Sequence, residues 1–441
     1  MAYQDIEDNS KKKSNKFACV AGNIIEWYEF SIFIFLSKYI APHFFGTNES
    51  YLTILYTFSA FAIGFLARPM GGIFFGLIGD IFSRKVSLII SVAMMTGATC
   101  IIGLIPSYTD IGIFSPILLI TCRIIQGVSA GGEFTTSSIM LIESNFRSKY
   151  YAGSISYASA QTGLLVGSIV GFAFFTFLSY AQDSSSNLWR LPFIACLPLG
   201  FVTYQMRKKV LDHYSIDVKR LPIKDIFYQL VTKNLHGLIF VFIINAFAQI
   251  IFYSYFFCVV NWQVSGLYEN SIFTSLMYNI INLGIIIALL PYFGKLYDQQ
   301  DEKRRYMTIS ISMLMLVFLT SILFFSMSIE NLIIKFIISA GYAVFIALLL
   351  APLPTLYSSC FEKNVRSTAM SISFNLSAAL IGGLAPIIIT ISSAKFGEIL
   401  GPSMIIGFIG LASLITFFNY TKQDRIIKHH IYGNSNEKPE F

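Results

Sequence analysis

Long apolar segments recur along this sequence, and they limit the possible folds more than any other feature. A helix needs about 20 apolar residues to cross the hydrocarbon core of a bilayer. Twelve segments approach or exceed that length, and they lie near residues 17–42, 51–78, 86–106, 112–142, 151–181, 189–206, 234–260, 271–293, 307–328, 331–357, 367–394 and 399–419. A soluble domain could not bury this much apolar surface, so we predict an all-α, polytopic membrane protein with about twelve transmembrane helices.

The distribution of Lys and Arg predicts how these helices are oriented. With the N-terminus placed in the cytoplasm, 25 of the 31 Lys and Arg residues fall in the tails and inner loops, and four fall at the outer side. Cytoplasmic loops carry such an excess, so we predict a protein of the cell (inner) membrane with both termini in the cytoplasm. The net charge of +7 then reflects topology and gives no reason to expect nucleic-acid binding.

Two short patterns in the predicted inner loops recur about half a chain apart. The pattern Glu-x-Asn-x-Arg-Ser begins at Glu143 and again at Glu362, and the pattern Gly-xxx-Asp before a basic pair ends at Asp80 and again at Asp298. Duplicated halves are typical of transporters, and coincidence among short basic loops is the alternative. We therefore predict a cytoplasmic tail (1–16), a six-helix bundle (17–206), a cytoplasmic central loop (207–233), a second six-helix bundle (234–420) and a cytoplasmic tail (421–441).

Five ionisable residues lie deep inside predicted helices of the first half, namely Glu26, Glu29, Arg68, Arg123 and Glu133. A charge at the middle of a bilayer costs at least about 2.5 kcal/mol, so each should face protein or water and have a partner. They leave one carboxylate in excess, and two carboxylates as close as Glu26 and Glu29 resist ionising together. We therefore predict that Glu26, Glu29 or Glu133 carries a proton. A structural ion pair of Arg123 with Glu133 or Glu29 is the alternative.

Neutral polar residues complete a candidate substrate site. At 100° per residue, Asn23, Glu26 and Trp27 share one stripe of the first helix. The second half offers only neutral polar groups inside its spans, so we expect it to supply hydrogen bonds and aromatic walls. The candidate substrate-binding residues are Asn23, Trp27, Arg68, Arg123, Gln126, Asn245 and Gln249, although a packing role for Trp27 is equally open. The cysteines lack metal-ligand spacing, and we predict no metal site and no cofactor.

Three motifs of the first half occur together in one known group of proteins. They are GNIIEWYEF (residues 22–30), RPMGGIFFGLIGD (68–80) and RIIQGVSAGGEF (123–134). Together they resemble the metabolite:proton symporter family, a branch of the major facilitator superfamily, and the resemblance implies a fold of two pseudo-symmetric six-helix bundles. Glu29 departs from the family pattern, which usually has Asp at that place.

The resemblance also implies a cytoplasmic gate. The stretch GLIGDIFSRK (76–85) is similar to the superfamily's loop between helices 2 and 3, except that Ser83 replaces the usual Gly. Such loops are expected to pair Asp with Arg across the inner ends of neighbouring helices. The candidate gate residues are Asp80, Arg84, Lys85, Glu143, Arg147, Asp298, Arg304, Glu362 and Arg366.

The family resemblance implies proton-coupled uptake (symport) of a small metabolite by alternating access, and we expect the protein to work as a monomer. Two buried arginines with one excess acid suit a zwitterion or a monoanion, and Trp27 could face a quaternary ammonium group through cation–π contact. Proline or glycine betaine is the expected substrate, and a small organic acid such as α-ketoglutarate is the alternative. A proton-independent facilitator is the rival mechanism. A receptor or a membrane-embedded enzyme has less support, because the sequence shows no signalling domain and no HExxH or GxSxG motif.

Overall fold

The computed structural model describes residues 2–46, 50–144, 148–181, 187–209, 220–258, 271–326, 328–329 and 331–432. Every regular element in these residues is helical, and ten helical stretches are long and apolar enough to cross a membrane. The prediction of an all-α, polytopic membrane protein is therefore confirmed. The first and sixth predicted spans are helical too, but the first contains Glu26 and Glu29 and the sixth is divided into short helices.

The first half of the chain forms one bundle. Its elements are α1 (Ala2–Phe35), α2 (Ser37–Phe45), α3 (Ser50–Ile81), α4 (Arg84–Leu104), α5 (Tyr108–Ile111), α6 (Phe114–Glu143), α7 (Lys149–Ala181), η1 (Asn187–Arg190), α8 (Leu191–Ile194) and α9 (Cys196–Lys208). Helix α1 packs against α6, α7 and α9, and α6 packs against α3 and α4. The residues of the three sequence motifs therefore lie on helices that are in mutual contact.

Glycines let α3 and α6 approach closely. A Cβ at Gly71 of α3 would lie 1.9 Å from a carbonyl oxygen of α6, and a Cβ at Gly131 of α6 would lie 2.3 Å from the Arg68 carbonyl oxygen. Only glycine leaves room for backbones at this distance. As a result, the guanidinium groups of Arg68 and Arg123 both reach the ring of Phe30 on α1, at 5.0 and 4.8 Å.

The second half of the chain forms the other bundle. Its elements are α11 (Ile223–Thr232), α12 (Leu235–Tyr253), η2 (Ser254–Cys258), α14 (Ser271–Gln299), α15 (Glu302–Ser326), α16 (Leu332–Leu350), α17 (Leu353–Ser359), α18 (Arg366–Ser377), η3 (Ala378–Gly382), α19 (Ala385–Phe396) and α20 (Leu400–Tyr432). The elements η2 and η3 are single π-helical turns. Such turns interrupt an α-helix, and they are frequent at functional sites.

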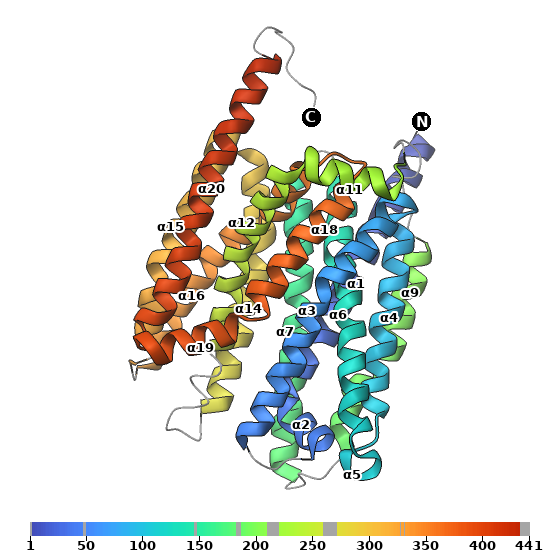
Figure 1. Ribbon diagram of the computed structural model, residues 1–441, viewed down its shortest axis with the longest axis vertical. Helices are drawn as coiled ribbons and strands as arrows, with labels where there is room; N and C mark the ends of the chain where they lie inside the picture. Colours follow the sequence, from blue (N-terminus) through green and yellow to red (C-terminus); the bar gives the residue numbers. More distant parts are fainter. Residues whose placement is uncertain are drawn as a thin grey trace.

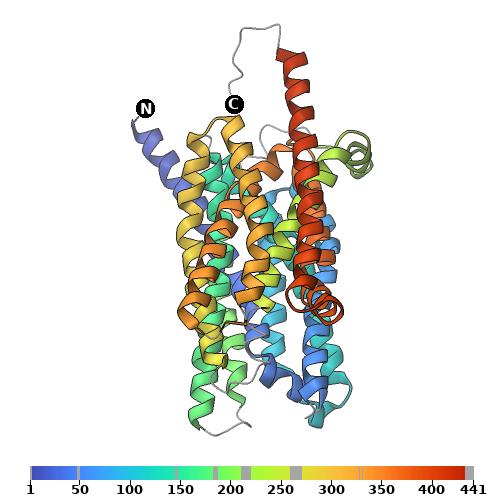
Figure 2. The ribbon, with the colours of Figure 1, turned by 90° about the vertical axis from the view of Figure 1, so that its left-hand side faces the viewer.

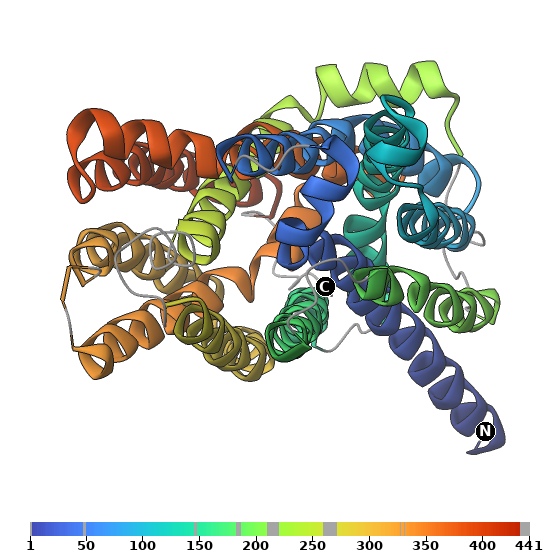
Figure 3. The same ribbon diagram turned by 90° about the horizontal axis from the view of Figure 1, so that it is seen from below.

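The two bundles stand side by side (Figures 1 and 3), and the start of α1 and the end of α20 lie at the same end (Figures 1 and 2). We call this the terminal end, and α11 lies across it (Figures 1 and 2). Helix α7 packs along α14, and α18 packs along α3 and α6, so these helices join the halves. Large apolar side chains such as Phe74, Phe318 and Phe408 are exposed, as expected where a membrane protein faces lipid.

Candidate functional site

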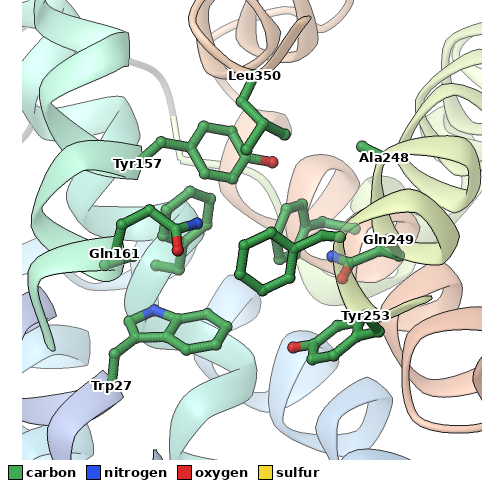
Figure 4. A pocket seen from close by; sticks show the side chains of 11 residues that line it. Trp27, Tyr157, Gln161, Ala248, Gln249, Tyr253 and Leu350 are labelled. Carbon is green, nitrogen blue, oxygen red and sulfur yellow. The ribbon is translucent and has the colours of Figure 1, made fainter. Parts of the chain in front are cut away.

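An aromatic cavity lies between the two bundles (Figure 4). It takes its walls from α1, α6 and α7 of the first half and from α12, α16 and α18 of the second. The lining residues are Trp27, Phe134, Tyr157, Ala160, Gln161, Ala248, Gln249, Phe252, Tyr253, Leu350 and Phe374. No charged side chain is among them in the described part of the chain. The cavity therefore presents ring faces and amide groups.

Two amides and one indole supply the polar groups of this cavity. Gln161 and Gln249 face the space from opposite halves, and Trp27 lies beneath it (Figure 4). The Trp27 Nε1 and Gln161 Oε1 atoms are buried and have no hydrogen-bond partner within the described residues. A ligand in the cavity can therefore accept a hydrogen bond from Trp27 and donate one to Gln161. Trp27 and Gln249 were predicted from the sequence, whereas Gln161 was not.

Arg68 lies behind Trp27 and is surrounded by rings. Its guanidinium carbon is 5.1 Å from the ring centroid of Trp27 and 4.5 Å from that of Phe65. The Phe65 ring in turn meets that of Tyr253 at 5.3 Å, in the cavity wall. No carboxylate among the described residues forms an ion pair with Arg68. The predicted substrate-binding arginine is thus one aromatic layer away from the cavity.

Arg123 is joined to Glu29 by a chain of hydrogen bonds and not by an ion pair. Arg123 Nη1 donates to Gln126 Oε1 at 2.8 Å, and Gln126 Nε2 donates to Thr99 Oγ1 at 2.7 Å. The Thr99 and Thr96 hydroxyls donate to the two oxygens of Glu29, at 3.2 and 3.0 Å. Gln126 therefore serves this network, and it does not line the aromatic cavity.

Glu133 pairs with an arginine that the sequence placed in a loop. Arg207 Nη1 donates to Glu133 Oε2 at 2.9 Å and to the Leu88 carbonyl at 2.6 Å, and its Nη2 contacts Glu133 Oε1. Arg207 lies in the last turn of α9 and is only 1% exposed. The alternative ion pair of Arg123 with Glu133 or Glu29 is therefore absent from the described residues, and Arg207 is a buried member of the first bundle.

Glu26 is the exception among these groups. Its side chain is 4% exposed, and neither of its carboxyl oxygens has a hydrogen-bond partner in the described ranges. A buried carboxylate without a partner is costly, whereas a protonated carboxyl group is neutral. Glu26 is therefore the carboxyl group of this set that lacks a compensating partner within the described residues.

Two predicted substrate-binding asparagines instead hold the wall helices together. Asn23 of α1 donates to Ser159 of α7 at 3.0 Å and accepts from Ser137 of α6 at 2.7 Å. Asn245 of α12 donates to Ser377 of α18 at 2.6 Å. Neither side chain lines the aromatic cavity in this arrangement.

The repeated acidic residues each cap a helix of the opposite half. Asp80 accepts hydrogen bonds from the backbone N–H groups of Ser367 and Thr368 at 3.1 and 2.8 Å, in the first turn of α18. Asp298 accepts from the backbone N–H groups of Tyr150 and Tyr151 at 3.0 and 2.9 Å, in the first turn of α7. A carboxylate at a helix N-terminus satisfies free N–H groups and opposes the helix dipole. These reciprocal caps join the halves at the terminal end.

The basic residues of the predicted gate are less symmetric than the acids. Arg84 and Arg366, one from each half, both pair with Glu143, and the Arg366 Nη1 to Glu143 Oε1 distance is 2.7 Å. In the other repeat, Arg304 is exposed and lies 3.5 Å from Asp301, whereas Arg305 lies over the Tyr150 ring at 4.9 Å. The gate contact of that repeat is thus made by the neighbour of the predicted arginine.

Three further gate candidates remain, and they are Glu362, Lys85 and Arg147. Glu362 is exposed, Lys85 is partly buried, and Arg147 lies outside the described residues. The Glu362 position shows that a matching sequence pattern does not guarantee a matching contact. The described residues also contain no cluster of His, Cys, Asp and Glu suited to a metal ion.

Known proteins resemble this chain over nearly its whole length. A Staphylococcus aureus (strain COL) protein, provisionally named a proline/betaine transporter, is 29% identical over 452 residues that cover 98% of this chain and 93% of that protein. The proline/betaine transporter of Escherichia coli (strain K12) is 27% identical, with coverage of 93% and 84%. A structure of the proton:xylose symporter XylE bound to 6-bromo-6-deoxy-D-glucose has a TM-score of 0.73 at 14% identity and covers 94% of this chain.

The family profile of the Major Facilitator Superfamily matches residues 19–386, which cover most of the first bundle and the second bundle as far as the start of α19. The superfamily consists of membrane transporters and not of enzymes, and the match agrees with the fold shared with the xylose symporter. The two bundles, the cavity between them and the family match lead to one conclusion: this chain is a multi-pass membrane transporter that belongs to the Major Facilitator Superfamily.

Proposed function

We propose that this protein is a proton-coupled symporter of a small zwitterionic or monoanionic metabolite, with proline or glycine betaine as the first candidate. The observation that carries the proposal is the position of Glu26, which is buried and has no partner in the described residues. It is adjacent in sequence to Trp27, and Trp27 lines an uncharged aromatic cavity between the bundles. The chain would work by alternating access in the cell (inner) membrane, with the terminal end in the cytoplasm. Because the cavity is formed within one chain, a monomer is sufficient.

The chemistry of the cavity supports a zwitterion with a quaternary or secondary ammonium group. Six of the lining residues are aromatic, and a cation over an aromatic face gains about 0.5–2 kcal/mol. The carboxylate of the same molecule can accept from the Trp27 indole and from the Gln249 amide. A tricarboxylate would bring three negative charges to walls without a cation, which is unfavourable. The names of the two relatives agree with this substrate class.

The unpartnered carboxyl group supports proton coupling. A proton on Glu26 neutralises a group that would otherwise be a buried, unpaired charge. We propose that Glu26 takes this proton from the outer side and loses it to the cytoplasm after the halves have rocked. In the state described here the two helix caps and the Glu143 pairs hold the terminal end together. These contacts would have to break before the substrate reaches the cytoplasm.

A small organic acid such as α-ketoglutarate is the second candidate, and one observation favours it. Arg68 and Arg123 have no carboxylate partner in the part of the chain that the structure describes. Rotation of Trp27 away from Arg68 would let a substrate carboxylate reach the guanidinium group. A proton-independent facilitator would use the same cavity without a change in the charge of Glu26.

Uptake into proteoliposomes tests the proposal. Purified protein is reconstituted, an inward proton gradient is imposed, and the accumulation of radiolabelled glycine betaine is measured with proline, α-ketoglutarate and citrate as competitors. We expect uphill accumulation that a protonophore abolishes, with competition by proline and none by citrate. Accumulation that survives the protonophore would contradict proton coupling, and competition by α-ketoglutarate alone would favour the second candidate.

A further inference from the structure

A second cavity lies along another face of α1, separate from the aromatic cavity. It is lined by Gly22, Ile25, Glu26, Glu29, Val92, Met95, Ser129 and Glu133. None of these residues lines the aromatic cavity. The second cavity, which we call the carboxyl chamber, therefore brings three acidic side chains to one space apart from the substrate cavity.

The three carboxyl groups of the chamber differ in their partners. Glu29 accepts hydrogen bonds from two threonine hydroxyls of α4, and Glu133 is paired with Arg207. Glu26 is buried and unpartnered and lines the same space. Of the three groups, Glu26 is therefore the one left free to exchange a proton.

Arg207 lies between Glu26 and the terminal end. A Cβ at Gly22 would be 1.6 Å from Arg207 Nη2, so the guanidinium group fills the place where any other residue would have a side chain. Gly22 precedes Glu26 by four residues, which is about one helical turn. Because α1 begins at the terminal end, Gly22 lies nearer to that end than Glu26 does, and the guanidinium group beside Gly22 lies on the terminal-end side of Glu26.

We propose that the carboxyl chamber is the proton-binding site and that Arg207 closes it on the cytoplasmic side. This inference rests on the proposed function. The proton is held as the O–H group of Glu26, and it leaves to water as the carboxylate forms. In the state described here, the fixed positive charge of Arg207 repels a proton that moves toward the terminal end. The chamber opens when the rocking of the halves separates α9 from α1.

Elementary electrostatics supports this role for Arg207. A positive charge in a narrow, poorly hydrated passage is an effective barrier to protons, because too little water is present to screen the repulsion between the two positive charges. Glu133, Leu88 and the space at Gly22 fix the guanidinium group in place. Arg207 is therefore a positioning residue for the proton and does not itself carry it.

The charged groups that face Glu26 come from four helices. They are Glu29 of α1 itself, Arg68 of α3, Glu133 of α6 and Arg207 of α9, while α4 contributes the neutral Ser91 through its contact with Glu133. Glu133 is paired with Arg207, so the charge of this group of residues changes when Glu26 gains or loses its proton. Arg68 and Arg207 are then the cations available to the carboxylate that remains.

The competing explanation is a structural ion pair between Arg207 and Glu133. Removing one partner of such a pair leaves a buried unpaired charge, whereas removing both charges is often harmless. The variant that separates the two explanations is therefore Arg207→Gln combined with Glu133→Gln. Glu133→Gln alone is the reference, because it keeps the positive charge in place.

Proton permeability provides a test that needs no substrate. Vesicles holding the protein and a trapped pH-sensitive dye receive an imposed pH step, and the rate of internal acidification is measured. We expect the double variant to acidify at least about tenfold faster than Glu133→Gln, since the barrier charge is gone. Arg207→Lys should stay nearly as tight as wild type. Lys209→Gln, which removes an exposed cation two residues away, is the matched control and should match wild type.

A second experiment measures transport of the substrate. Glycine betaine counterflow needs no net proton movement, so Arg207→Lys should retain counterflow. Gly22→Ala should also retain counterflow. This variant should nevertheless increase proton leakage, because the added methyl group displaces the guanidinium group. A double variant that is as proton-tight as Glu133→Gln would overturn the proposal. If wild-type protein fails to accumulate betaine against a gradient, the proposed function fails, but the permeability comparison still decides the role of Arg207.

Discussion

The two halves of this transporter share a fold but divide the chemistry between them. All eight buried charged residues of the described chain lie in the first half, and they are Glu26, Glu29, Arg68, Asp80, Arg84, Arg123, Glu133 and Arg207. The second half buries asparagines instead, such as Asn245, Asn279 and Asn282. Charge is therefore not needed to build this type of bundle. Its concentration in one half agrees with the proposal that this half binds the proton while the other supplies a neutral wall.

The largest expected difference between the halves concerns the coupling of substrate accumulation to the proton gradient. Replacing Glu26 by Gln should abolish proton-driven accumulation of the substrate while counterflow continues, because the amide keeps the shape of the carboxyl group but cannot release a proton. Replacing Asn282 by Ala in the second half should leave proton coupling intact. Accumulation ratios in proteoliposomes check both variants. Loss of proton coupling in Asn282→Ala but not in Glu26→Gln would contradict the assignment of proton binding to the first half.

Substrate binding should depend on both halves almost equally. Trp27→Ala in the first half and Phe252→Ala in the second each remove a ring from the cavity wall, and a cation–π contact contributes about 0.5–2 kcal/mol. Each variant should therefore raise the KM for glycine betaine by roughly 2- to 30-fold. Trp27→Phe keeps a ring and should cost less. Unchanged KM values in both alanine variants would contradict the placement of the substrate in this cavity.

The reciprocal caps should differ in strength although their geometry is similar. Asp80 is 2% exposed and also accepts from the Thr368 hydroxyl at 2.8 Å, whereas Asp298 is only partly buried and accepts two hydrogen bonds. Losing a helix cap costs about 0.5–2 kcal/mol. Asp80→Ala should therefore expose the terminal end more than Asp298→Ala does, as measured by labelling of a cysteine introduced in the cavity. Equal labelling would show that the two repeats are equivalent.

The smallest expected effect concerns the end of the first half opposite the termini. Burial and the adjacent Arg190 guanidinium lower the pKa of His43, whose Nε2 lies 2.7 Å from Arg190 Nη2. Because the pKa of His43 is lower in the folded than in the unfolded protein, its contribution to stability is complete above its usual pKa of about 6.5 and declines as the pH falls below that value.

A comparison of melting temperatures checks the effect of His43. Wild type should lose about 1–2 °C more than His43→Gln does when the pH is lowered from about 7.5 to about 5.5, because Gln can accept the hydrogen bond without becoming charged. A matched control in the second half is His236→Gln, which should behave like wild type. Identical pH dependence in wild type and His43→Gln would contradict a neutral His43.

Apolar length and charge bias were sufficient to predict the fold, since a chain in lipid must pair its backbone groups within helices. The same reasoning located Glu26 and Trp27, because a charge or a polar ring within a long apolar run is conspicuous. Arg207 was missed for a physical reason. At the end of a helix and beside two lysines, an arginine can extend to the membrane surface or turn inward, and the choice depends on Glu133, 74 residues away in the sequence.

Details of packing within the predicted elements were also beyond the sequence. Gln161 lies among small residues of α7, where periodicity alone gives no reason to expect it to face a cavity formed with another bundle. The second repeat has extra residues before its basic pair, so Arg305 and not Arg304 reaches Tyr150. A pattern gives residue types and approximate spacing, but the rotation of a helix about its axis depends on all of its neighbours.

The exchange of caps between the halves has a consequence for how fast the transporter can work. Asp80 binds a helix of the second bundle and Asp298 binds a helix of the first. Rocking of the halves that opens the terminal end would stretch both attachments. Turnover should then be limited by one concerted conformational change whose activation barrier includes both attachments. Weakening either attachment should speed the return of the empty carrier.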